Sequence, residues 1–399
     1  MVPFLLKSFF GFFFFDFISL IFSILRLVVF SISLLSFFSS NLFSGLRKFS
    51  SKFLILIIYF VIIRFLVSSY IIFYLFLELI FLIIFFSLIK SGTKIEREIS
   101  AYYMFFFTLA SSLPLIIFII ISISNFKIHT LYIYHMWSGF WWMFIFIVFF
   151  VKVPVFGVHI WLPKAHVEAP LPGSVVLSGI LLKIGFYGIF RFINFSKFFI
   201  NNWFSIFISL GWMGGLVITL VCLRQIDVKS IIAYSSVVHM GVGLSGCLRD
   251  NFTSVISSLL IRFAHGLSSP IMFYVLYIIY NKENTRRILL IKGRRFKNPL
   301  IGYIILIVMV SSIGLPPMIS FFSEFMSNIG VIFHRQRFIL ASMILFFSTG
   351  VYLIYFFVYF FHGVNSHTRL NQADRPDLIL IIFLPVNLIM YPVLLKRII

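Results

Sequence analysis

The chain consists of long apolar runs separated by short segments in which charged residues, glycine, proline and asparagine gather. A run of about 20 apolar residues is long enough for a helix to cross the hydrocarbon core of a bilayer. The pattern predicts about twelve such helices, over residues 16–38, 53–70, 71–90, 101–123, 139–161, 173–192, 203–223, 229–247, 254–280, 300–328, 337–362 and 378–395. The segment 3–15 is a candidate for a partial extra helix. With no long linker in the sequence, we expect one all-α integral membrane protein.

Two of the predicted helices carry helix-breaking residues near their middles. The first contains Pro154 and Gly157, and the second contains Gly314, Pro316 and Pro317. Because proline removes a backbone hydrogen bond and clashes with the preceding turn, we expect each helix to break there. Broken backbone is tolerated at membrane depth only inside protein or beside a polar cavity. Both breaks therefore mark candidate polar sites.

The two breaks are separated by about five predicted helices, and an apolar helix follows each of them. This spacing predicts two repeated halves, over residues 53–192 and 203–362. An odd number of helices in each half would invert the second half relative to the first, as in many transporters.

Composition supports a membrane location and limits the function. The chain is 61% hydrophobic and 11% charged, whereas soluble domains carry roughly 25% charged residues. The net charge of +21 lies mostly in short loops, so it indicates topology rather than nucleic-acid binding. The most basic loop, 281–297, falls on the same predicted side as Lys90, Lys94, Arg97, Lys164, Arg224 and Lys229, which places that side in the matrix or cytoplasm. The 57 phenylalanines suggest a T-rich, organellar genome.

Six ionisable residues lie within the apolar runs or at the breaks, where each charge costs about 2.5–3.5 kcal/mol on insertion scales. They are Glu78, Lys152, Lys183, His239, His265 and Glu324. Any one of them could be a structural residue with a satisfied partner, but six together favour a buried polar path. A carboxylate about 4 Å from an ammonium contributes about 4 kcal/mol at an effective dielectric of 20, enough to change which group holds a proton. The pattern thus predicts proton transfer without a cofactor.

Other polar residues have simpler interpretations. His159, His166 and Glu168 follow the first break and fit no zinc-binding spacing, so we expect them to fix that loop or to pass protons rather than to bind metal. Cys222 and Cys247 are isolated, which argues against an iron–sulfur cluster. Arg64 and Arg262 are expected to be structural residues near helix ends, with charges that reach the interface.

The segment "KVPVFGVHIWLPKAHVEAPLPGSVVLSGILLKIGFYGIFR" (152–191) closely resembles the family of chain 4 of mitochondrial NADH–ubiquinone oxidoreductase, respiratory complex I. "CLRQIDVKSIIAYSSVVHMG" (222–241), "AHGLSSP" (264–270) and "GLPPMISFFSEF" (314–325) resemble further blocks of that family in the same order. The resemblance implies two inverted five-helix repeats, each with a broken helix, and a hydrophilic axis through the middle of the membrane.

The resemblance also implies proton translocation driven by quinone reduction elsewhere in the complex. Glu78 would be the glutamate partner of the lysine at the broken helix, Lys152, and Lys183 the connecting lysine on the next helix. His239 and His265 would continue the relay to Glu324, the terminal exchanger at the second break. Relative to the family, residues 1–52 would hold a shortened set of N-terminal helices, and 363–399 a C-terminal helix.

The resemblance implies a multi-pass protein of the mitochondrial inner membrane, encoded in the organelle. Its partners would be other membrane-arm subunits, especially the sister chains 2 and 5, together with lipid and without nucleic acid. FMN, iron–sulfur clusters and ubiquinone would be bound by other subunits. Two alternatives remain: a cation/proton antiporter subunit of the Mrp type, and a membrane-arm scaffold with a vestigial proton path. The scaffold hypothesis rests on the short N-terminus and on "LELIFLI" around Glu78, where the family usually has threonines and a proline.

Overall fold

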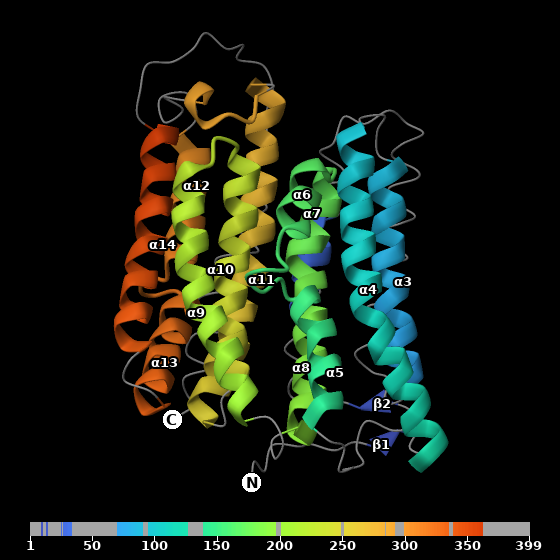
Figure 1. The fold of residues 1–399 in the computed structure, drawn as a ribbon. Helices are drawn as coiled ribbons and strands as arrows, with labels where there is room; N and C mark the ends of the chain where they lie inside the picture. Colours follow the sequence, from blue (N-terminus) through green and yellow to red (C-terminus); the bar gives the residue numbers. More distant parts are fainter. Residues whose placement is uncertain are drawn as a thin grey trace. The chain divides into compact units, whose positions relative to one another are not determined.

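The computed structural model describes residues 9–10, 13–14, 25, 27–33, 70–90, 95–126, 139–196, 201–248, 251–283, 285–291, 299–334 and 338–361. Nearly all of these residues are helical (Figure 1). Seven of the helical stretches in this part of the chain are long and apolar enough to cross a membrane. The prediction of an all-α, multi-pass membrane protein is therefore confirmed. The predicted helix over 378–395, and that over 53–70 except for its last residue, lie outside the described residues.

The chain forms two compact units, of which unit 1 comprises Met1–Pro154 with Val158–Trp203, and unit 2 comprises Val155–Gly157 with Phe204–Ile399. The boundary falls close to the expected boundary between the two halves, but the inverted symmetry of those halves stays a prediction.

Unit 1 is built from α3 (Tyr70–Lys90), α4 (Ile95–Phe126), α5 (Gly139–Lys152), α6 (Trp161–Glu168), α7 (Leu171–Val176), the π-helical turn η1 (Leu177–Leu181) and α8 (Leu182–Ser196). Helix α4 packs against α3, α5 and α6, and α8 packs against α5. The short helix α6 was not predicted. The strands β1 (Phe9–Phe10) and β2 (Phe13–Phe14) form an antiparallel pair, so the expectation of a partial helix over 3–15 is wrong.

Unit 2 contains α9 (Asn201–Arg224), α10 (Val228–Cys247), α11 (Phe252–Glu283), the 3₁₀ turn η2 (Ile288–Leu290), α12 (Pro299–Ile313), α13 (Ile319–His334) and α14 (Phe338–Phe361). Helices α10 and α13 both pack extensively on α11, and α14 packs on α12 and α13. Every residue of α11 from Ser257 to Leu276 is buried. It is therefore the central helix of unit 2.

Both predicted helix breaks are present. Helix α5 ends at Lys152 and α6 begins at Trp161, with eight residues between them, and α12 ends at Ile313, shortly before α13 begins at Ile319. Each break contains a glycine with positive φ, Gly157 at 101° and Gly314 at 80°. Residues other than glycine rarely adopt this conformation, so these glycines allow the chain to leave one helix and enter the next at these points.

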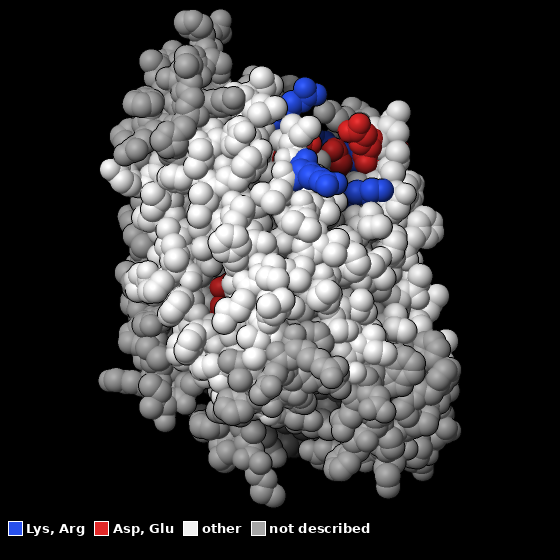
Figure 2. All heavy atoms as spheres, turned by 60° about the vertical axis from the view of Figure 1, so that its left-hand side comes forward, with Lys and Arg blue, Asp and Glu red and all other residues white. Residues whose placement is uncertain are grey.

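The charged connections of unit 2 meet at one end of its helices. Asp227 and Arg287 form an isolated antiparallel bridge, and the Val228 amide donates to the Arg286 carbonyl at 3.1 Å. The segments that precede α10 and η2 thus lie together, as the topology argument predicted for this half. On the face shown in Figure 2, most of the visible lysine, arginine, aspartate and glutamate side chains of the described residues gather toward one end. The other described side chains on this face are mostly uncharged, as expected for a surface in contact with lipid.

Candidate functional site

In unit 1, the structure places Lys152 and Glu78 in direct contact. Lys152 is the last residue of α5, and its Nζ donates to Glu78 Oε1 of α3 at 2.6 Å. The lysine side chain is fully buried, whereas that of Glu78 is 14% exposed. The same Nζ lies 4.7 Å from the ring centroid of Phe81, one turn after Glu78. A carboxylate and an aromatic face thus stabilise an ammonium group that would otherwise be costly to bury.

The first helix break determines where Lys152 lies. The Val153 amide closes the last turn of α5 by donating to the Phe149 carbonyl at 2.7 Å. Trp161 begins α6 and donates through Nε1 to the Val151 carbonyl at 3.0 Å, so the two ends of the break are linked. Gly185 of α8 lies against the same turn, because a Cβ there would be 3.2 Å from Lys152 Cβ. Close packing on several sides therefore holds the lysine in position.

Lys183 lies in a different kind of environment. It is 1% exposed on α8, and its Nζ donates at 2.6 Å to the backbone carbonyl of Ser178, five residues earlier. That carbonyl belongs to the π-helical turn η1, where the widened backbone departs from the α-helical hydrogen-bond pattern. A backbone carbonyl is a neutral acceptor, in contrast to the carboxylate beside Lys152. The two lysines of unit 1 are thus held by groups of different charge.

The polar residues after the first break tie α6 to α4. Glu168 Oε2 lies 3.8 Å from Arg97 Nε, and Lys164 Nζ lies 3.6 Å from the centroid of the Tyr103 ring. His166 is fully buried on α6, and His159 lies within the break, partly exposed. The contacts of Glu168 support the loop-fixing interpretation of this residue. Among the described residues, no group of three or more histidines, cysteines, aspartates or glutamates gathers as metal ligands.

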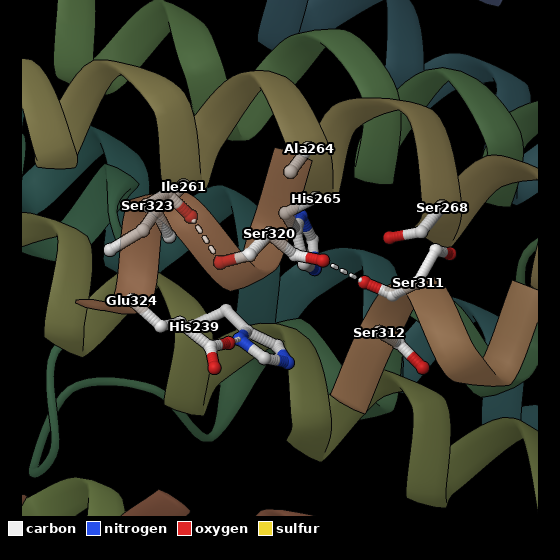
Figure 3. A pocket seen from close by; sticks show the side chains of 10 residues that line it. All are labelled: His239, Ile261, Ala264, His265, Ser268, Ser311, Ser312, Ser320, Ser323 and Glu324. Carbon is white, nitrogen blue, oxygen red and sulfur yellow. Dashed lines mark hydrogen bonds and ion pairs between the residues drawn. The ribbon is translucent and has the colours of Figure 1, made fainter. Parts of the chain in front are cut away.

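In unit 2, the structure brings together three of the predicted residues from three helices. Glu324 of α13 faces His239 of α10, with 3.9 Å between Oε1 and Nδ1 (Figure 3). The His239 ring centroid lies 5.7 Å from that of His265 on α11. These side chains surround a small pocket, whose other lining residues are Ile261, Ala264, Ser268, Ser311, Ser312, Ser320 and Ser323. With several polar partners, the pocket can hold ordered water.

The second break positions Glu324. A Cβ built on Gly314 would lie 2.5 Å from Glu324 Oε2, so the carboxylate rests directly against the backbone of the break. Ser320 Oγ donates to the Ser311 carbonyl at 2.5 Å and joins α13 to the end of α12 across the break. Sequence reasoning missed the serines of this site, because serine is tolerated in most membrane helices. The sequence feature that could have identified these serines is their clustering around the Gly-Leu-Pro-Pro break.

Gly314→Ala is expected to lower proton transfer through unit 2 by about 10-fold or more, because small displacements of a reacting group have effects of this size. The added methyl group would meet the Glu324 carboxylate at a residue whose φ is 80°. Proton movement across the membrane of vesicles, normalised to the amount of the protein, checks this result. Two further variants serve as controls. Gly157→Ala places an alanine at a positive φ, but nothing lies within 4 Å of the added Cβ, so it tests backbone strain alone. Gly350→Ala introduces neither a positive φ nor a close contact. Equal activity of the Gly314 and Gly350 variants would contradict the assignment.

Arg262 differs from the prediction. It was expected near a helix end with its charge at the interface, but it lies within α11 with 0% exposure. Its Nη2 donates to the Gly243 carbonyl at 2.9 Å and to Cys247 Sγ at 2.6 Å, both on α10. The central position of α11 buries this residue, which the apolar pattern of one helix does not reveal.

Each unit therefore contains its own buried acid–base group. Unit 1 holds the Glu78–Lys152 pair together with Lys183, and unit 2 holds the group of His239, His265 and Glu324. Both groups lie beside a helix break. Lysine, histidine and carboxylate side chains can each take up and release a proton, so both groups have the chemistry of a proton relay. The individual roles of the six residues stay predictions.

Comparison with known proteins identifies a family model and relatives that the chain matches. Residues 67–356 match the family model described as NADH:quinone oxidoreductase/Mrp antiporter, TM. The chain is 33% identical over 362 residues to NADH-ubiquinone oxidoreductase chain 4 of Rhipicephalus sanguineus, covering 90% of this chain and 82% of the relative. It is 37% identical over 306 residues to the same chain of Artemia franciscana, covering 75% and 77%.

The fold is similar to those of two solved structures. One is a chain of respiratory complex I from Thermus thermophilus with bound NADH, with a TM-score of 0.86, 21% identity, and coverage of 95% of this chain and 81% of that one. The other is a chain of the Mrp complex from Dietzia sp., with a TM-score of 0.78, 16% identity, and coverage of 89% and 68%. The motifs, the two broken helices, the family model and the identity to chain 4 relatives agree. The chain belongs to the NADH-ubiquinone oxidoreductase chain 4 family, among the NADH:quinone oxidoreductase/Mrp antiporter membrane proteins.

Proposed function

We propose that this chain is a proton-translocating subunit of the membrane arm of respiratory complex I in the mitochondrial inner membrane. It would couple NADH:ubiquinone electron transfer elsewhere in the complex to proton movement across the membrane. The observation that carries the proposal is the pairing of a buried acid–base group with a broken helix in each unit. Membership of the chain 4 family supports the assignment to complex I.

In unit 1, the contact between Glu78 and Lys152 supplies a simple switch. While the carboxylate is 2.6 Å away, it stabilises the lysine in its charged form. A movement of α3 or of the break that separates the two groups would remove this stabilisation, and Lys152 could then give its proton to a neighbouring acceptor. Lys183, held by a neutral carbonyl, would receive the proton and pass it on. The reverse movement would restore the pair and recharge Lys152.

In unit 2, the His239–Glu324 separation of 3.9 Å is too long for a direct hydrogen bond but fits exchange through a bridging water. The serines of the pocket provide hydroxyl groups that orient such a water. A proton on His239 or His265 could then reach Glu324, the exchanger beside the second break. All these steps move protons only, so this chain needs no redox centre for them.

The remaining parts of the proposal concern partners and cofactors. The sister antiporter-like chains 2 and 5 would be neighbours of this chain, as the resemblance to the chain 4 family implies. FMN, iron–sulfur clusters and ubiquinone would be bound by other subunits, and this chain would bind neither metal nor cofactor. The supporting observation is that the acid–base groups of the described residues are lysine, histidine and glutamate side chains packed among helices.

A native gel tests the assignment to complex I. The chain is expected to migrate with NADH dehydrogenase activity in a detergent extract of the inner membrane, and its deletion is expected to remove that activity band. The alternative is a cation/proton antiporter subunit of the Mrp type, which is consistent with the similarity in fold to the Mrp complex. It predicts a different result. Sodium or potassium exchange by vesicles that contain the chain without complex I would favour the antiporter and contradict the proposal.

A further inference from the structure

A polar seam runs between α10 and α11, two antiparallel helices that lie side by side in unit 2 (Figure 1). We call it the α10–α11 seam. It has three levels, each about one helical turn from the next on both helices. The levels are His239 with His265, Gly243 with Arg262, and Cys247 with Ser258. The first level is the pocket of the acid–base group, and the third approaches the connection between the two helices.

The seam is polar but tightly packed beyond the first level. Arg262 and Ser258 are 0% exposed, and Cys247 is 1% exposed. Cys247 Sγ contacts both the Arg262 guanidinium at 2.6 Å and Ser258 Oγ at 3.3 Å. A Cβ on Gly246 would lie only 2.8 Å from the Ser254 carbonyl oxygen, so the helices approach closely there. Thiol, hydroxyl and carbonyl groups thus continue from the pocket toward the α10–α11 connection.

Such a row of polar groups could conduct protons toward that connection and dissipate the gradient. Arg262 stands in the middle of it, one turn before His265 on the same helix. A guanidinium group stays protonated under all physiological conditions and cannot pass a proton on. At a separation of about 6 Å and an effective dielectric of 20, its repulsion lowers the occupancy of an adjacent site by an excess proton about 100-fold.

We propose that Arg262 is an electrostatic gate that closes the α10–α11 seam to protons. The inference rests on the proposed function, because it assigns the gate to the relay of His239, His265 and Glu324. The Gly243 carbonyl and the Cys247 sulfur hold the guanidinium across the seam. A fixed arginine excludes protons and cations from other membrane pores by the same physics. Arg262 thus acts through its positive charge, which repels an excess proton from the neighbouring site, and it does not exchange a proton itself.

The test measures passive proton leak in the assembled complex. Proteoliposomes that contain the complex receive an imposed pH gradient without NADH, and a pH-sensitive dye follows its decay. Arg262→Met, which keeps much of the side-chain volume, is expected to raise the leak about 10-fold or more over wild type. Arg262→Lys and Ser258→Ala retain the positive charge and are expected to leak as little as wild type. The double variant Arg262→Met/Glu324→Gln is expected to return toward wild type, because its leak path would lose the exchanger.

An assembled Arg262→Met complex with a wild-type leak would overturn the gate and leave Arg262 a structural link between α10 and α11. If the Arg262→Met complex does not assemble, Arg262→Gln replaces it in the leak measurement. Glutamine is neutral and is a hydrogen-bond donor for the Gly243 carbonyl. Failure of both neutral variants to assemble, with Arg262→Lys intact, would also count against the gate, because the charge would then be needed for folding. The leak is measured without NADH, so a failure of NADH-driven pumping, which would contradict the proposed function, is seen separately.

Discussion

Glu324→Gln is expected to lower NADH-driven proton pumping, per assembled complex, by about one to two orders of magnitude, the usual effect of losing a proton-transfer group. The substitution preserves the size of a buried side chain that faces His239 and lies against the backbone of Gly314. It removes the group that can carry a proton at the end of the unit 2 relay. Dye-quenching in inverted membrane vesicles, normalised to the amount of assembled complex, measures the effect.

Glu98→Gln is the matched control for this experiment. Glu98 is a carboxylate in the first turn of α4 with its side chain exposed, so the same change of charge there should leave pumping close to wild type. A Glu324→Gln complex that assembles and pumps like the Glu98→Gln complex would show that Glu324 is no exchanger. The scaffold hypothesis would then become the better account of unit 2.

The second large effect is expected at the Glu78–Lys152 pair. Glu78→Gln leaves the fully buried ammonium of Lys152 without its carboxylate, and breaking such a pair typically costs about 3–5 kcal/mol. We therefore expect much less assembled complex on a native gel, together with a loss of pumping. The double variant Glu78→Gln/Lys152→Met removes both charges, so assembly should recover while pumping stays low.

This double-mutant comparison separates stability from function. Recovery of both assembly and pumping in the double variant would assign the pair a structural role and favour the vestigial proton path. Normal assembly of Glu78→Gln would indicate that the contact at 2.6 Å contributes little to the folded state. Recovery of assembly alone is the result that the proton-relay account requires.

Sequence patterns predicted the spans and the breaks because these depend on local properties of the chain. Apolar length determines which segments cross the membrane, and the combination of proline with glycine marked both breaks. Proline alone was not sufficient, since Pro114 and Pro270 lie inside the continuous helices α4 and α11. The additional feature at the two breaks is a glycine with positive φ. A conformation of this kind cannot be read from hydrophobicity.

The sequence predicted fewer of the groups that contact the ionisable residues. The Glu78–Lys152 contact was expected from the family resemblance, and the structure shows it. The Ser178 carbonyl beside Lys183 depends on a π-helical turn that the pattern of apolar residues does not reveal. The burial of Arg262 depends on the packing of several helices around α11, which no single segment encodes. Tertiary packing therefore decides which charged side chains are buried and which groups surround them.

The most direct test of the central claim is the number of protons translocated per NADH oxidised by the reconstituted complex. Glu78→Gln, Lys183→Ala and Glu324→Gln are each expected to lower the coupled proton flux well below wild type. Ser178→Ala should leave it unchanged, because Lys183 contacts the backbone carbonyl of that residue. Wild-type coupling in all three charge variants would contradict the account, since the chain would then carry no proton path through these residues.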